Sequence, residues 1–562
     1  MADRITRRQF IRRAAGTALI VSASGGPLMV GCTRREFDLL IRGGLVIDGL
    51  GGNPFIADIG IRDGRITAIG QLDGKTAARI VDASGKAVSP GFIDVHTHTD
   101  VGLLINPKAE SKIRQGVTTE ISGQCGDSPF PLAGPSGDRF KERMANEFGL
   151  DVDWTDLDGF LTRLERNRTA VNYTTFAGHG SIRAAIMGED NRAPTSEEMR
   201  KMQDAVRTAM EQGAFGLSSG LEYTPGSFAE TDEIVALCRV VSKQGGLYAT
   251  HMRSEDIRVE EALEEAISIA QQADIPLQIS HLKASQQRNW HKLPGMLDRI
   301  AQAERDGIAV HADRYTYAAW ATTLTILFPM WSREGGERAL TARLADEAQW
   351  RRIKPELLDK VDAMGGWERV LISRITSEVR RHCQGKIVTA LAEETGIDPT
   401  EMVRKLLIDE NGDVGMVGFA MSEENTGRVL AFPLTMVGSD GNAVAPYGPL
   451  SRENPHPRYY GTFPRYLGHY VRERKILPLP EAIRRITSLP AKTFGIPDRG
   501  EISENMVADV VIFDPDRIID KATFTAPHQY PEGIDAVIVN GQIVVEKGEH
   551  TGALPGRVLR KV

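Results

Sequence analysis

Eight short apolar segments, each ending in small or polar residues, recur along the middle of this 562-residue chain. Most are separated by segments with helical periodicity, such as 195–212 and 258–273. Strands that alternate with helices predict βαβ units and a parallel sheet. Eight such units predict an α/β fold with a closed (β/α)₈ barrel of the TIM type. The expected strands lie at 91–98, 117–126, 172–180, 213–220, 246–252, 276–281, 308–317 and 435–441.

The expected barrel, 91–470, is longer than the roughly 250 residues of a minimal barrel. Most of the excess lies between the seventh and eighth strands, at about 325–425, which reads as a helical insertion. This insertion either covers the barrel mouth or is a peripheral decoration. The flanks, 38–90 and 500–562, contain short alternating strands with glycine-containing turns. We therefore expect both chain ends to build one small β-sandwich beside the barrel.

The first 32 residues differ from the rest of the chain. Arg7 and Arg8, followed by Phe10, precede an uncharged run over 14–31 that ends at Cys32. This pattern resembles a twin-arginine export signal joined to a lipoprotein cleavage box. The resemblance implies export by the twin-arginine machinery to a periplasmic or membrane-anchored location, with Cys32 as the lipid anchor. The alternative is an uncleaved helical anchor.

Composition excludes several other classes of protein. The formal net charge of −7 gives no electrostatic argument for binding nucleic acid. Beyond residue 31, no run approaches the roughly 20 apolar residues that a membrane span needs. Four cysteines in a chain of this size do not form a disulfide framework, so Cys125 needs a separate explanation.

Potential metal ligands follow several of the expected strands. His96 and His98 are two residues apart at the end of the first strand, so their side chains point the same way. Barrel enzymes carry their chemistry at the C-terminal ends of the strands. Imidazole, thiolate and carboxylate groups together suit Zn²⁺. The pattern therefore favours a metal site over the alternative of isolated, hydrogen-bonded histidines. The other candidates at the same rim are Cys125, His251, His281 and Asp440.

Seven motifs resemble those of the amidohydrolase superfamily and, within it, the N-acyl-D-amino-acid deacylase (D-aminoacylase) family. They are "GFIDVHTHTD", "GQCGDSPFP", "SSGLEYTPG", "THMRSE", "ISHLKAS", "VGSDG" and "HPRYYGTFPR", and the resemblance runs from about residue 38 to the C-terminus. It implies zinc-dependent hydrolysis of N-acyl-D-amino acids to a carboxylate and a free D-amino acid. The alternatives are a cyclic-amide hydrolase of the hydantoinase or dihydroorotase type and a non-catalytic exported binding lipoprotein.

By position, the resemblance also implies two metal sites that share Cys125. Asp440 is the expected proton shuttle, first as a base and then as an acid toward the departing nitrogen. Its alternative role is to cap a helix after the eighth strand. The tighter zinc site is expected at Cys125, His251 and His281, and the weaker one at His96, His98 and Asp440, with Cys125 able to bridge.

The family's substrates carry a free α-carboxylate, which requires a cation near the metal. Lys283 is the positional match for this cation, although it also reads as a solvated loop lysine. Tyr315 and Tyr223 match tyrosines that help to bind the carboxylate, or else they pack at the rim. Arg253 either neutralises an acidic substrate or pairs with Glu255.

One position departs from the family pattern. Family members often carry a serine a few residues beyond the tyrosine of the seventh strand, where it contributes to carboxylate binding. This chain has Ala321 there, followed by Thr322 and Thr323, and Trp320 beside them is expected to line the side-chain pocket.

Overall fold

A computed structural model describes residues 35–561 of the chain. The expected export signal and Cys32 therefore lie outside the described residues. Between residues 35 and 561, no helix combines the length and the apolar character needed to cross a membrane.

All eight expected barrel strands form, and parallel pairing joins each to its neighbours. The third strand is interrupted once, so it appears as two consecutive pieces. The ring closes where Thr97, just after the first strand, makes a parallel bridge with Gly441, just after the last. In chain order the strands are β6 (Phe92–Asp94), β7 (Val117–Ser122), β8 (Asn172–Thr175) with β9 (Ala177–Gly178), β10 (Gly216–Gly220), β11 (Leu247–His251), β12 (Leu277–Ile279), β13 (Val310–Arg314) and β17 (Thr435–Val437).

Helices on the outside of the ring bury one apolar side against the strands. The helix predicted at 195–212 is α7 (Ser196–Glu211), which begins at a capping box formed by Thr195 and Glu198. The helix predicted at 258–273 is α9 (Val259–Ala273). The other barrel helices are α2 (Gly102–Ile105), α3 (Glu110–Ile113), α4 (Gly134–Phe148), α5 (Leu157–Asn167), α6 (His179–Met187), α8 (Thr231–Ser242), α10 (Leu293–Arg305) and α15 (Glu423–Ala431), with α16 (Arg458–Arg465), α17 (Leu479–Arg485) and α18 (Ser488–Phe494) after the last strand.

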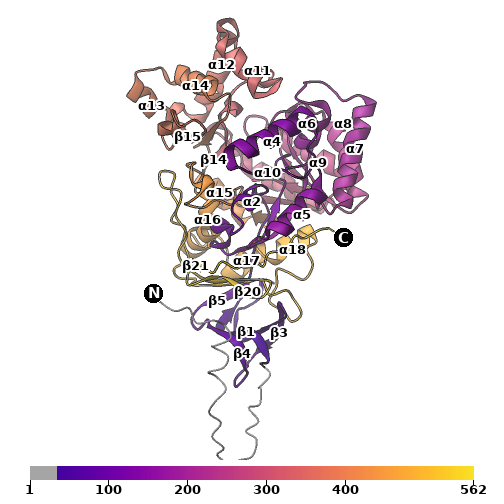
Figure 1. The fold of residues 1–562 in the computed structure, drawn as a ribbon, viewed down its shortest axis with the longest axis vertical. Helices are drawn as coiled ribbons and strands as arrows, with labels where there is room; N and C mark the ends of the chain where they lie inside the picture. Colours follow the sequence, from indigo (N-terminus) through magenta and orange to yellow (C-terminus); the bar gives the residue numbers. More distant parts are fainter. Residues whose placement is uncertain (1–34, 562) are drawn as a thin grey trace, which may run out of the picture.

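The segment between β13 and β17 contains an insertion with a hydrophobic core of its own. It lies at one end of the molecule (Figure 1). The expected helices are present, but the insertion also contains three antiparallel strands, which pair in the order β14-β16-β15. Each is short and pairs with a distant segment, so local sequence gave no sign of them. The elements are β14 (Trp320–Thr323), α11 (Gly336–Ala345), α12 (Glu347–Met364), β15 (Val370–Ile375), α13 (Val388–Thr395), α14 (Pro399–Asp409) and β16 (Val414–Gly418).

Strands from the two chain ends meet at the opposite end of the molecule (Figure 1). We expected both ends to build one small β-sandwich; their nine strands form one hydrogen-bonded sheet, and residues from both ends share an apolar cluster. The two sets become one sheet because β18 pairs antiparallel with β5. The strands are β1 (Phe37–Val46), β2 (Phe55–Arg62), β3 (Arg65–Gly70), β4 (Ala77–Asp82), β5 (Ala87–Pro90), β18 (Val510–Phe513), β19 (Ile534–Val539), β20 (Gln542–Glu546) and β21 (Glu549–His550).

A buried polar network fastens this sheet to the barrel. Asp509 accepts a 2.9 Å hydrogen bond from Nδ2 of Asn172, on barrel strand β8, and it also pairs with Arg499. The backbone N–H of Asn540 donates to the other carboxylate oxygen at 2.6 Å. Removing Asp509 would leave the Arg499 guanidinium without its carboxylate in a site closed to water.

We predict that Asp509→Ala destabilises the protein by about 3–5 kcal/mol, because a buried charge loses its partner. Thermal unfolding should show a clear fall in midpoint. The matched control is Asp535→Ala, which removes a 3.1 Å ion pair with Lys86 from a side chain that is 44% exposed. That change should cost less than about 1 kcal/mol. Equal falls in the unfolding midpoint for the two variants would contradict the proposed contribution of the buried network to stability.

Candidate metal centre

The structure brings the six expected metal ligands together at the carboxyl ends of the barrel strands. Each follows or ends its strand, so the parallel arrangement directs all of them to one rim. His96 and His98 follow β6, and Asp440 follows β17, at the seam where the ring closes. Cys125 follows β7, His251 ends β11, and His281 follows β12.

Cys125, His251 and His281 have the spacing of ligands to one tetrahedral ion. The Cys125 sulfur lies 3.4 Å from Nε2 of His281 and 4.0 Å from Nδ1 of His251, and the two nitrogens are 3.1 Å apart. Ordinary zinc–sulfur and zinc–nitrogen bonds at tetrahedral angles give ligand separations of about 3.6 Å and about 3.3 Å. The donor set and its geometry therefore fit zinc.

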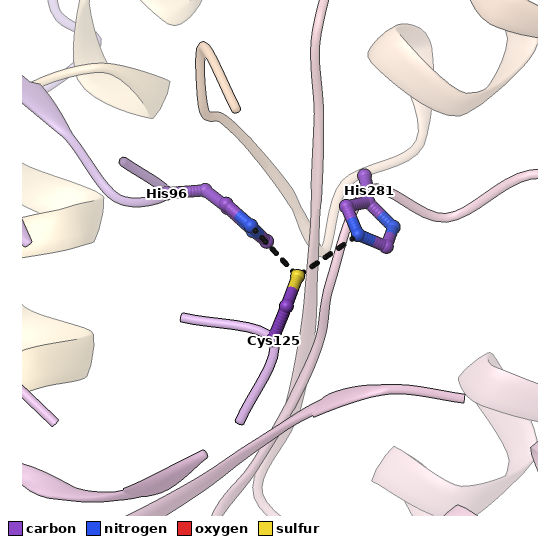
Figure 2. A group of neighbouring side chains, drawn as sticks. All are labelled: His96, Cys125 and His281. Atoms are coloured by element: carbon purple, nitrogen blue, oxygen red, sulfur yellow. Dashed lines mark hydrogen bonds between the residues drawn. The ribbon is translucent and has the colours of Figure 1, made fainter. Parts of the chain in front are cut away.

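A second set of ligands adjoins the first. Oδ1 of Asp440 lies 3.1 Å from Nε2 of His98 and 3.6 Å from Nε2 of His96. The same nitrogen of His96 is 3.4 Å from the Cys125 sulfur, and Figure 2 shows this sulfur between His96 and His281. The Cys125 sulfur therefore lies where it could bind a metal ion held by either ligand set.

Three ligands have left-handed backbone conformations. The φ angles are +53° at Cys125, +37° at His281 and +50° at Asp440. Non-glycine residues rarely adopt such angles, and those that do are concentrated at functional sites. At each of these residues the backbone turns sharply after its strand, which directs the side chain toward the centre of the rim.

Neighbouring charges favour the ligating forms of the thiol and the carboxyl. Burial alone would raise the pKa of Cys125, but the His96 and His281 charges hold it well below its usual value. Burial also opposes ionisation of Asp440, yet Arg458, 2.9 Å away, holds the pKa of that carboxyl well below its usual range. Thiolate and carboxylate are the forms that bind metal.

Each of three histidine ligands has a carboxylate behind it, on the ring nitrogen that faces away from the cluster. A carboxylate in this position holds the proton on its own side, so the other nitrogen is free to bind metal. The pairs are His96 Nδ1 with Asp313 at 3.3 Å, His251 Nε2 with Glu222 at 3.3 Å, and His281 Nδ1 with Glu255 at 2.9 Å.

Sequence reasoning gave no role to these carboxylates or to Arg458. Three of the four residues lie inside motifs that carried the family resemblance: Glu222 in "SSGLEYTPG", Glu255 in "THMRSE" and Arg458 in "HPRYYGTFPR". Asp313 lies near the end of the seventh strand, so its position at the rim was the available signal. Its partner, His96, is far away in the sequence and could not be inferred from spacing.

A cavity opens beside the metal ligands, and three of the four expected substrate-binding residues line it: Lys283, Tyr223 and Tyr315. Nζ of Lys283 contacts Glu255 at 2.5 Å. The ring of Tyr223 lies 4.6 Å from that of His251, measured between centroids. Lys283 is therefore a buried, paired cation and not a solvated loop lysine.

The fourth expected residue, Arg253, does not line the cavity. Its guanidinium pairs with Glu265 at 2.8 Å and donates to the backbone carbonyls of Ser227 and Ala229. Both earlier interpretations of Arg253 are corrected, because it faces neither a substrate nor Glu255. At the position of the missing serine, Ala321 and Thr322 both line the cavity.

Comparison with known proteins agrees with this site. The model of the amidohydrolase family matches residues 79–365 and 386–545. A D-aminoacylase from Alcaligenes xylosoxydans xylosoxydans is 38% identical, covering 94% of this chain and 98% of that protein. An N-acyl-D-glutamate deacylase from the same organism is 34% identical over 94% of this chain and 97% of its own length. The chain belongs to the N-acyl-D-amino-acid deacylase family of amidohydrolases.

A solved structure supports the same assignment. N-acyl-D-glutamate deacylase from Bordetella bronchiseptica, complexed with zinc and a phosphonate that mimics the tetrahedral reaction intermediate, superposes with a TM-score of 0.79. The two chains are 34% identical, and the match covers 93% of this chain and 99% of the other. As a member of this family, the chain is a metal-dependent amidohydrolase of the deacylase kind, with a TIM-barrel amidohydrolase fold.

We predict that Asp313→Asn weakens zinc binding by about 10- to 100-fold, as is usual when the group behind a ligand is changed. Asp313 accepts hydrogen bonds from the backbone N–H of His281 and from Gln278 as well as from His96, and an amide cannot accept from all three. Competition against a chelator measures the affinity. The control is Asp520→Asn, which changes a buried carboxylate bonded to Tyr317. Unchanged zinc affinity in Asp313→Asn would contradict the role assigned to that carboxylate.

Proposed function

We propose that this chain hydrolyses the amide bond of N-acyl-D-amino acids with zinc, releasing a carboxylate and a free D-amino acid. The observation that carries the proposal is the position of Lys283, which lines the same cavity as His251, His281 and Asp440. A cation beside metal ligands matches a substrate with an α-carboxylate close to its scissile amide. Three relatives that are 34–38% identical over nearly the whole chain are deacylases by name, whereas a D-hydantoinase that spans 93% of the chain is only 22% identical.

We expect Cys125, His251 and His281 to hold the tighter zinc ion, and His96, His98 and Asp440 to hold a weaker second ion. A bound zinc ion supplies a water of lowered pKa and polarises the amide carbonyl. The protein's own residues must then hold the metal ligands in place and transfer protons. The carboxylates behind the histidines do the first, and Asp440 is placed to do the second.

Arg458 holds one carboxylate oxygen of Asp440 and so fixes the direction of the other. Nη1 of Arg458 lies 2.9 Å from Oδ2, and Oδ1 faces the histidines of the second ligand set. The fixed carboxylate can take a proton from the attacking water and pass it to the departing nitrogen. The cavity lining includes Asp440, so this transfer would occur at the substrate.

Lys283 can bind a substrate carboxylate without leaving Glu255. An ammonium group has three protons; the contacts with Glu255 and with Nδ1 of His281, 2.9 Å away, involve two of them, so one remains for the substrate. Tyr223 and Tyr315 line the same cavity and carry hydroxyl groups that can donate to the second carboxylate oxygen.

Stereochemistry tests the proposal directly. The purified chain, supplied with a defined amount of zinc, should release D-amino acids from N-acetyl-D-amino acids and show little turnover of the L-isomers. Free amino acid is measured by chromatography on a chiral phase. Faster turnover of hydantoin or dihydroorotate than of any N-acyl-D-amino acid would contradict the proposal.

Lys283→Met should lower kcat/KM by roughly 10- to 150-fold, since a hydrogen bond to a charged group contributes about 1.5–3 kcal/mol. Zinc content is measured alongside, because Nζ of Lys283 lies 2.9 Å from Nδ1 of His281, and the expected loss of activity should remain when the variant is compared at full zinc loading. The loss should largely disappear with a substrate whose α-carboxylate is converted to an amide. Cys125→Ala gives the contrast, because it should lose zinc and activity toward both substrates. Wild-type rates in Lys283→Met with the acid substrate would show that the carboxylate site is elsewhere.

We also propose that the chain is exported by the twin-arginine route and retained at the membrane by lipid on Cys32. The support is the sequence alone: Arg7 and Arg8 before an uncharged run that ends at this cysteine. Replacing both arginines with lysine should leave the protein in the cytoplasm, and Cys32→Ala should release a soluble exported form. Cell fractionation measures both. Export of the double-lysine variant, or unchanged membrane association of Cys32→Ala, would contradict the respective part.

A further inference from the structure

The cavity beside the metal ligands has two walls of different character. Barrel loops form the first wall, which carries the histidines, Asp440 and Lys283. The insertion forms the second wall, where Trp320, Ile326 and Met364 present apolar surface to the cavity. The indole N–H of Trp320 donates to the hydroxyl of Ser285 at 3.2 Å, which holds the ring in place.

The charged groups of the lining are predominantly acidic. Four carboxylates but only two lysines line the cavity, and each lysine already contacts a carboxylate. Lys360, the lysine of the insertion, lies 3.3 Å from Glu222 and also donates to the carbonyl of Ile326 at 3.0 Å. The four carboxylates belong to Glu222, Glu255, Asp256 and Asp440.

This arrangement bears on the substrate's side chain. The α-carboxylate has Lys283 and the metal to compensate its charge, but a second carboxylate would meet no unpaired cation among the lining residues. It would lose its hydration in a cavity whose lining carries more carboxylates than lysines, which is unfavourable. A basic side chain that lies against the insertion would meet apolar surface and Lys360, and three of the four carboxylates already pair with Lys360, Lys283 or Arg458.

We infer that the enzyme selects N-acyl-D-amino acids whose side chain is uncharged and apolar, and that the insertion supplies the surface that binds it. This inference rests on the proposed function and names the substrate class within it. Trp320, Ile326 and Met364 come from β14, the turn after it and α12, so the binding surface exists only when the insertion is folded against the barrel. The fixed indole requires little further ordering when a side chain binds.

The first test compares four substrates on the zinc-loaded wild-type enzyme. N-acetyl derivatives of D-methionine and D-leucine should have kcat/KM values at least about 100-fold above those of D-glutamate and D-arginine, because the pocket would leave a buried charge unpaired. If the D-glutamate or D-arginine derivative comes within about 10-fold of D-methionine, the inferred selectivity is wrong.

The second test adds a cation to the insertion wall. Met364→Arg and Ile326→Arg, made separately, should each raise kcat/KM for N-acetyl-D-glutamate relative to N-acetyl-D-methionine by at least about 10-fold, because the guanidinium can pair with the new carboxylate. Val379→Arg is the control, since this residue of the insertion is 80% exposed and does not line the cavity. Its substrate ratio should equal that of wild type.

Zinc content and circular dichroism establish that each variant is folded and loaded. If both arginine variants are folded and loaded but keep the wild-type ratio, the insertion wall does not bind the side chain. If either fails to fold, the other variant and the substrate comparison still decide. Hydrolysis of charged D-substrates in preference to apolar ones would refute this inference alone. No turnover of any N-acyl-D-amino acid would refute the proposed function and this inference with it.

Discussion

Two backbone hydrogen bonds between the first and last barrel strands hold the site and the fold together. The N–H of Asp440 donates to the carbonyl of His96 at 2.8 Å, and the N–H of His98 donates to the carbonyl of Gly441 at 3.0 Å. They lie at the seam where the ring of strands closes, and three of the four residues are candidate metal ligands. Closing the barrel and assembling the second ligand set are therefore one structural event.

The regular part of this arrangement could be predicted because it is encoded locally. Each strand is an apolar run, and the side chains at its end reach a common rim whenever the strands are parallel. His96 and Asp440 are far apart in the sequence, yet this rule alone was enough to place them together. The same reasoning failed two residues beyond His251. The strand ends there, so alternation no longer applies, and Arg253 turns away to Glu265.

The supporting residues could not be predicted, because their roles depend on tertiary pairing. Nothing near Asp313 in the sequence indicates that its carboxylate meets His96 from the adjoining part of the barrel. The insertion was similar: α12 has helical periodicity, but nothing in the sequence indicates that its Lys360 reaches Glu222. Glu222 in turn contacts His251, so a contiguous chain of polar contacts joins the insertion to the metal ligands.

The left-handed backbone conformations at Cys125, His281 and Asp440 lower the stability of the fold. Each such residue costs about 1–3 kcal/mol relative to a relaxed backbone. Glycine would adopt the same angles without that cost, but it has no side chain to bind a metal. Selection for stability alone would therefore remove these residues. At these three positions the side chain supplies a candidate metal ligand at a cost in stability, a trade-off that many enzymes make.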